Sequence, residues 1–248
     1  MIWYNMESWH LLYLLLPLAA FLYASVGHGG ASSYLMFLAL FNFVPEQIRP
    51  TALLMNIAIS FLAFINFKQK VNFPKKLFFA LILFSMPAAY LGGTVVIDTV
   101  LYKRILGVLL LFPIIHFLKI LPYSAEPVIK ERFWIAALTG LFLGFFSGLI
   151  GIGGGIILSP ILLMLGWTNI RETAAISALF IFLNSIMGYW GASAWRIPIN
   201  TEIWSLMPLV IIAGAAGAYF GARRFNIQTI RYLLITVLSF ASIKLITA

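Results

Sequence analysis

The chain has 248 residues, of which 62% are hydrophobic and 9% are charged, and it carries a formal net charge of +9. Its mean hydropathy of +1.03 predicts an integral membrane protein with no soluble catalytic domain, because a soluble domain cannot bury so much apolar surface. The chain contains no cysteine, which excludes disulfides, thiolate metal sites and cysteine catalysis. The basic residues lie between apolar segments, where they orient membrane spans, so nucleic acid is not an expected partner.

Apolar segments recur along the whole chain, at lengths near the roughly 20 residues that a membrane-spanning helix needs. The first set covers residues 9–26, 31–43, 50–67, 76–96 and 100–121, and the second covers residues 133–150, 155–166, 173–193, 203–221 and 228–247. Between the sets, the stretch KILPYSAEPVIKER holds two prolines and five charges. We therefore predict a first membrane repeat over residues 1–121, a central linker loop over 122–132 and a second membrane repeat over 133–248.

The two sets share short motifs in the same order. SVGHGGASS at 25–33 aligns with LIGIGGGII at 149–157, and IRPTA at 48–52 aligns with IRETA at 170–174. The offsets of these two pairs are 124 and 122 residues. Ordered matches at a nearly fixed offset indicate a tandem repeat of one membrane unit.

The basic residues indicate how the two repeats face. If each half crosses the membrane an odd number of times, one side of the membrane receives eleven of the sixteen basic residues. These eleven lie in the loops at 66–76, 119–132, 167–172 and 222–231. An even number of crossings divides the basic residues nine against seven, and this split favours neither orientation of the chain in the membrane. The positive-inside rule therefore favours inverted halves with both termini outside the cytoplasm.

The second segment of each half is short, since residues 155–166 extend about 18 Å as a helix, against a hydrocarbon core of about 30 Å. These short segments either form a re-entrant hairpin or complete a fully spanning broken helix. Both arrangements give an odd number of crossings per half and so agree with the distribution of basic residues. The expected fold class is an all-α integral membrane protein with two inverted-topology repeats. Each repeat has a glycine-broken or re-entrant helix pair plus about three full transmembrane helices.

Glycine runs precede the short segment of each half. An interior glycine costs a helix about 1 kcal/mol relative to alanine, and non-helical backbone inside lipid is tolerated only where protein or a water-filled cavity covers it. The short helices start near Ala31 and Gly155, and helix N-termini bind anions through free N–H groups and about half a positive charge. We therefore predict an anion site near the midplane. Its candidate residues are Ser25, Gly27, His28, Gly29, Gly30, Ser32, Ser33, Ser147, Gly151, Gly153, Gly154, Gly155 and Ser159.

Close helix packing is the alternative explanation for these glycines. For five other glycines, packing is the favoured explanation, because they follow the small-xxx-small spacing of close membrane helices. They are Gly140, Gly144, Gly148, Gly217 and Gly221.

Five further polar residues are candidates for lining the transport path or its mouths. They are Arg49, Asn56, Asn66, Arg171 and Asn184. Polar groups inside a membrane face the protein interior, so the asparagines either line the path or bond one helix to another. The arginines of IRPTA and IRETA either attract an anion at each mouth or anchor the chain at the interface.

The acidic residues all fall in loops or at segment ends. No span therefore carries the interior carboxylate that many proton-coupled carriers use. A coupling proton would have to use His28 or His116, or travel on the substrate, and His116 fits a structural role better. No metal, cofactor or catalytic residue is predicted, because no catalytic set can be assembled without cysteine, buried acids or clustered histidines.

The stretches ASVGHGGASSYL, GLFLGFFSGLIGIGGGIILSPIL and NIRETAAISALF resemble the paired signatures of the TauE/SafE family of sulfite and organosulfonate exporters. The first motif departs from the second, because His28 takes the place of the apolar Ile152. The resemblance implies a multi-pass secondary transporter, usually an exporter, that carries a small sulfur oxyanion or sulfonate across the cytoplasmic membrane. A passive anion channel is the alternative function, followed by an intramembrane enzyme. Besides the lipid bilayer, a homo-oligomeric partner is left open.

Overall fold

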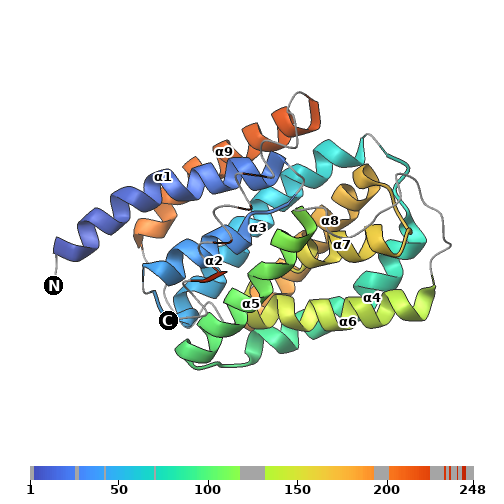
Figure 1. Ribbon diagram of the computed structural model, residues 1–248, viewed down its shortest axis with the longest axis horizontal. Helices are drawn as coiled ribbons and strands as arrows, with labels where there is room; N and C mark the ends of the chain where they lie inside the picture. Colours follow the sequence, from blue (N-terminus) through green and yellow to red (C-terminus); the bar gives the residue numbers. More distant parts are fainter. Residues whose placement is uncertain are drawn as a thin grey trace.

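The computed structural model describes residues 3–25, 28–41, 43–69, 71–117, 132–192 and 201–223, with five single residues beyond them. Every regular element in these ranges is an α-helix (Figure 1). The helices are α1 Trp3–Ser25, α2 Ala31–Leu40, α3 Pro45–Lys68, α4 Lys75–Thr94, α5 Thr99–Phe117, α6 Phe133–Ile150, α7 Gly155–Met164, α8 Ile170–Gly191 and α9 Thr201–Arg223. Nine of the ten predicted segments overlap these helices, and most of the tenth, 228–247, lies outside the described residues.

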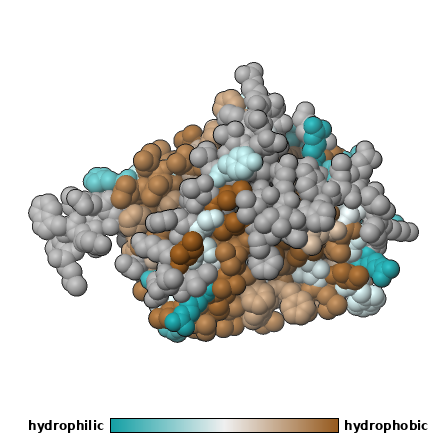
Figure 2. Space-filling model, in the orientation of Figure 1, coloured by the Kyte–Doolittle hydropathy of each residue, from teal (hydrophilic) through white to brown (hydrophobic). Residues whose placement is uncertain are grey.

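Five of the described helices are long and apolar enough to cross a membrane, namely α3, α4, α6, α8 and α9. Large apolar side chains cover their outer faces, such as Trp134 at 71% exposure and Ile212 at 67%. Figure 2 shows brown apolar side chains over much of the described surface on that face. A soluble protein does not expose apolar surface on this scale, so the chain is a multi-pass membrane protein.

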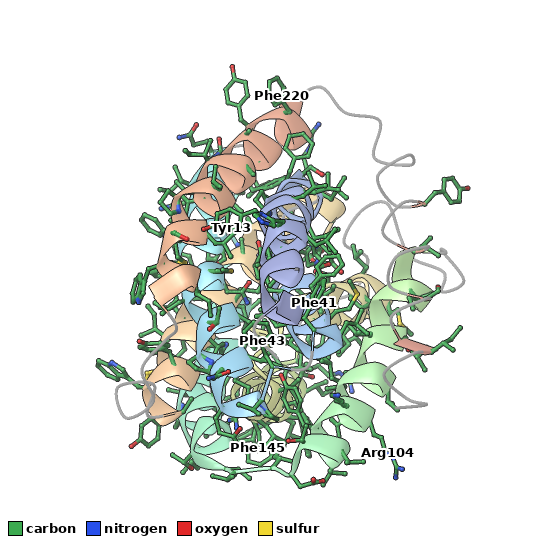
Figure 3. The ribbon with its side chains drawn as sticks, turned by 90° about the vertical axis from the view of Figure 1, so that its left-hand side faces the viewer. Tyr13, Phe41, Phe43, Arg104, Phe145 and Phe220 are labelled. Atoms are coloured by element: carbon green, nitrogen blue, oxygen red, sulfur yellow. The ribbon has the colours of Figure 1, made fainter. Side chains whose placement is uncertain are left out.

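The main packed pairs of helices from the two halves have counterparts in which the corresponding helices have changed places. In the alignment of the halves, α1 corresponds to α6, α3 to α8 and α4 to α9. Helix α4 packs along α6, and the corresponding pair, α9 and α1, also lies side by side, with Tyr13 of α1 hydrogen-bonded to Ser205 of α9 (Figure 3). Helices α3 and α8, which correspond to each other, pack together. This exchange symmetry is the arrangement that a tandem repeat produces.

Glycines allow the outer helix pairs to pack backbone against backbone. A Cβ at Gly148 of α6 would collide with the carbonyl oxygen of Ala89 in α4, and one at Gly221 of α9 would collide with the carbonyl of Ser25 in α1. The same kind of contact is made by Gly140, Gly144 and Gly217. The packing role predicted for all five glycines is confirmed.

Helices α2 and α7 are short, with 10 residues each, and both begin directly after a glycine in the left-handed region. Gly30 precedes α2 with φ 89°, and Gly154 precedes α7 with φ 77°. Residues other than glycine rarely adopt this backbone conformation, so the glycines set the points at which the two helices start. The predicted starts at Ala31 and Gly155 are confirmed, and both lie in the buried interior.

Candidate functional site

The two glycine breaks meet at the side chain of Asn56, which projects from α3 and is fully buried. Its Oδ1 accepts a hydrogen bond of 3.1 Å from the N–H of Ala31, the first residue of α2. Its Nδ2 donates a hydrogen bond of 3.2 Å to the carbonyl of Ile152, in the break before α7. One amide therefore joins the break of the first half to the break of the second.

A second polar contact links the halves one helical turn further along α7. The Nε2 of His28 lies 3.0 Å from the Oγ of Ser159. That hydroxyl donates to the carbonyl of Gly155 at 3.0 Å and lies 2.8 Å from the Oγ of Ser177 in α8. Ser159 therefore lies within hydrogen-bond distance of three groups, which are the imidazole of His28, the carbonyl of Gly155 and the hydroxyl of Ser177.

Glycine is required where the breaks surround Asn56. A Cβ at Gly29 would lie 2.5 Å from the Oδ1 of Asn56, and one at Gly153 would lie 2.7 Å from its Nδ2. The side chain of Ile181 in α8 closes the other side, 2.8 Å from the Cβ position of Gly153. Any larger residue at Gly29 or Gly153 would displace the amide, so the glycines bring both backbones to one polar group.

Two buried hydroxyls beside the second break have no hydrogen-bond partner in the described part of the chain. Ser147 of α6 and Ser185 of α8 are 1% and 0% exposed. The Oγ of Ser185 lies 3.1 Å from the Cβ position of Gly153, and the Cβ of Ser147 lies 3.4 Å from that of Gly154. An unsatisfied buried polar group costs about 1 to 3 kcal/mol, which makes these two hydroxyls candidates for binding a ligand.

The predicted serines of the first half are placed differently. The Oγ of Ser25 donates to the carbonyl of Leu22 in its own helix at 2.6 Å. Ser32 and Ser33 are buried in the first turn of α2. Gly27 lies outside the described residues. Gly151 ends α6 with φ 91°.

Arg49 lies inside the protein, with an exposed fraction of 6%. Its guanidinium donates to the carbonyls of Gly92, Gly93 and Val95 at the C-terminal end of α4 and to Gly148 of α6, at 2.9 to 3.3 Å. The carbonyls of Gly92, Gly93 and Val95 lie at the negative end of the α4 dipole, and the four bonds together favour the anchoring alternative for Arg49. Arg171 is exposed at the start of α8.

Of the other asparagines, Asn66 donates to Leu62 and Asn184 donates to Phe180, each within its own helix at 2.9 Å. Asn184 is fully buried and its Oδ1 has no partner among the residues described.

Ser177 and Ser185 are further candidate site residues, which sequence reasoning missed. They occur eight residues apart with Ile181 midway, which is the spacing of one helix face, and this signal points to them. Among the described residues, no group of three His, Asp or Glu side chains is placed to hold a metal ion. The side chain of His116 lies outside the described part of the structure.

Comparison with known proteins gives one family match over almost the whole chain. The model described as "Sulfite exporter TauE/SafE" matches residues 12–245, which confirms the resemblance seen in the glycine motifs. No solved structure matches the chain.

Curated relatives carry transporter names. "Probable membrane transporter protein y4hK" of Sinorhizobium fredii is 32% identical over 92% of this chain and 94% of the relative. "Probable membrane transporter protein MJ0441" of Methanocaldococcus jannaschii is 34% identical over 42% of this chain and 40% of the relative. "Probable membrane transporter protein MamO" of Paramagnetospirillum magneticum is 30% identical over 45% of this chain and 18% of the relative.

Proposed function

This chain belongs to the sulfite exporter TauE/SafE family, and we propose that it is a secondary transporter that exports small sulfur-containing anions, such as sulfite or organosulfonates, across the cytoplasmic membrane. The family and the names of the relatives indicate a membrane transporter rather than an enzyme. The observation that carries the finer proposal is the meeting of the two helix breaks at Asn56, inside a multi-pass membrane protein.

The polarity of this centre suits an anion. Helices α2 and α7 both begin there, and each N-terminus contributes roughly half a positive charge, with N–H donors at the start of α7 that bond to none of the described residues. The acidic residues of the neighbouring central helices lie at their ends, since Glu46 and Glu172 are in the first turns of α3 and α8. A negatively charged substrate therefore meets donors and positive dipole ends without a competing carboxylate.

The arrangement of the halves supports alternating access to this centre. In Figure 1, α1 runs from left to right and the corresponding α6 runs from right to left. Corresponding helices of opposite direction are the mark of inverted-topology repeats, whose substrate sites lie at the repeat interface near the midplane. We therefore keep the division into a repeat at 1–121, a linker at 122–132 and a repeat at 133–248 as part of the proposal.

Flux measurements on the full chain in liposomes test the function. Vesicles loaded with labelled sulfite should release it faster than protein-free vesicles, and unlabelled sulfite or methanesulfonate outside should accelerate the release. Acceleration from the opposite side distinguishes a carrier from a passive channel, whose flux lacks it. Absence of protein-dependent flux for sulfite, thiosulfate, sulfoacetate and methanesulfonate would refute a sulfur-anion transporter.

A further inference from the structure

We infer that the two glycine breaks differ in role: the oxyanion head group of the substrate binds at the N-terminus of α7, between Ser147 and Ser185, and Asn56 fills the equivalent place at α2. This inference rests on the proposed function, because it assigns the substrate of that same site. It follows from which donors at each break already have partners.

At the first break, three N–H donors of α2 are occupied, including that of its first residue. The N–H of Ala31 donates to Asn56, and the N–H groups of Ser33 and Tyr34 donate to the carbonyl of Gly30 at 3.0 and 3.2 Å. The amide oxygen of Asn56 sits so close to Gly29 that a single added carbon would lie 2.5 Å from it. A neutral side-chain oxygen thus holds the position that an anion would take.

At the second break, the equivalent position has no such oxygen. The N–H groups of Ile157 and Leu158 turn back to the carbonyl of Gly154, at 3.2 and 3.1 Å, and those of Gly155 and Ile156 donate to no described residue. In the alignment of IRPTA with IRETA, the counterpart of Asn56 is Ala178, whose methyl group cannot accept a hydrogen bond. The first N–H of α7 therefore lacks the side-chain acceptor that Asn56 supplies to the first N–H of α2.

Two side chains independently indicate a ligand at the start of α7. The hydroxyl of Ser147 comes from α6 and that of Ser185 from α8, so they approach the break from two different helices. Both are at least 99% buried and lack partners among the described residues. Buried hydroxyls without partners are rare in folded proteins, and here the Oγ of Ser185 lies against Gly153 and the Cβ of Ser147 lies against Gly154.

The donor set defines the chemical class of the ligand. Two backbone N–H groups and two hydroxyls can reach the three oxygens of a sulfite or sulfonate head group, which offers only acceptors when ionised. The hydroxyls come from two helices of the second repeat that flank α7, namely α6 and α8, so the head group would be held by the second half alone. From the first half, Asn56 reaches this break through its hydrogen bond to the carbonyl of Ile152.

Equilibrium binding of sulfite and methanesulfonate to the purified full chain in lipid nanodiscs tests the inference. Ser147→Ala and Ser185→Ala should each weaken binding about 10- to 100-fold, the effect of losing one hydrogen bond to a charged group. The control variant Ser85→Ala, buried in α4, should bind as the wild type does, and Ser32→Ala, in the first turn of α2, should weaken binding far less than Ser147→Ala does. Without ligand, the thermal unfolding midpoints of Ser147→Ala and Ser185→Ala should match or exceed that of the wild type, because each removes an unpaired buried hydroxyl.

The outcomes separate this inference from the proposed function. Equal weakening by Ser32→Ala and Ser147→Ala would mean a site shared by both breaks, which overturns the asymmetric assignment and leaves sulfur-anion transport intact. Wild-type binding by Ser147→Ala and Ser185→Ala would also overturn it. If the wild type neither binds nor transports any of the sulfur anions, the proposed function itself fails, and this inference fails with it.

Discussion

The imidazole of His28 and the hydroxyl of Ser159 lie 3.0 Å apart, although 131 residues separate them along the chain. His28 precedes the short helix of the first half, and Ser159 is part of the short helix of the second. In an alternating-access cycle the halves move against each other, so a buried bond between them must rearrange. This contact is therefore a place where a substitution should change the transport rate.

Two substitutions of His28 test whether transport needs a hydrogen-bond donor at this position or an imidazole in particular. His28→Gln keeps an N–H donor at a similar reach, whereas His28→Ala leaves Ser159 with one partner fewer in a buried site. We expect His28→Ala to slow sulfite flux at least about 10-fold, as the loss of about 1.4 kcal/mol predicts, and His28→Gln to retain more flux. The pH dependence of flux should persist in His28→Gln if the proton travels on the substrate. Equal flux in His28→Ala and the wild type would show that this contact takes no part in transport.

Asn56→Asp should reduce anion binding at neutral pH. The aspartate oxygen can still accept the N–H of Ala31, but it has no donor for the carbonyl of Ile152 and it adds a negative charge to the buried centre. We expect the Kd for sulfite to rise by more than about 10-fold and to recover partly in acid, as the carboxylate becomes protonated. Asn66→Asp is the matched control, because Asn66 donates only to its own helix. An unchanged Kd in Asn56→Asp would place the anion away from the breaks.

The breaks could be predicted from sequence because glycine runs and helix length are local properties. Gly30 and Gly154 mark the starts of α2 and α7, and His28 and Asn56 stand out as polar residues in apolar segments. Ser185 has a weaker signal: its spacing from Ser177 places both on one face of α8, but only packing brings that face against Gly153.

Arg49 shows the other limit of sequence reasoning. A charged side chain near a segment end suggests contact with water, but the partners of Arg49 are carbonyls 43 to 99 residues away in the chain. Their position depends on how the ends of α4 and α6 come to lie beside the start of α3, which no local pattern records. For the same reason, the sequence alone left the anchoring role and the mouth role of Arg49 undecided.

Arg49→Gln should destabilise the fold. Glutamine cannot replace the four hydrogen bonds that Arg49 makes to buried carbonyls. Hydrogen bonds to charged groups contribute about 1.5 to 3 kcal/mol each, so we expect a clearly lower thermal unfolding midpoint in detergent at both low and high salt. Arg171→Gln, at an exposed position, should leave the midpoint unchanged and slow anion entry only at low salt. A wild-type midpoint for Arg49→Gln would contradict the anchoring role.

Gly148→Ala should loosen the packing of α6 on α4, because its Cβ would collide with the carbonyl of Ala89. Overpacking costs about 1 to 3 kcal/mol, so the thermal unfolding midpoint should fall. Gly188→Ala is the matched control, since its Cβ would lie 3.2 Å from Gly148 and 3.4 Å from a terminal methyl of Leu53, contacts that a small shift relieves. Equal midpoints for the two variants would mean that α4 and α6 can separate without cost.

Cysteine labelling at the two ends of α4 tests the membrane orientation. The chain has no native cysteine, so a single introduced cysteine is the only thiol in the protein that the reagent can label. Lys76 lies in the first turn of α4, in the basic loop assigned to the cytoplasm, and Val96 follows the other end of the helix with 81% exposure. The positive-inside rule predicts that an impermeant maleimide labels Val96→Cys in intact cells and Lys76→Cys only after permeabilisation. Because α4 is a single span of 20 residues, the two variants must give opposite results. Labelling of Lys76→Cys in intact cells with protection of Val96→Cys would reverse the orientation, and both termini would then have to be placed inside.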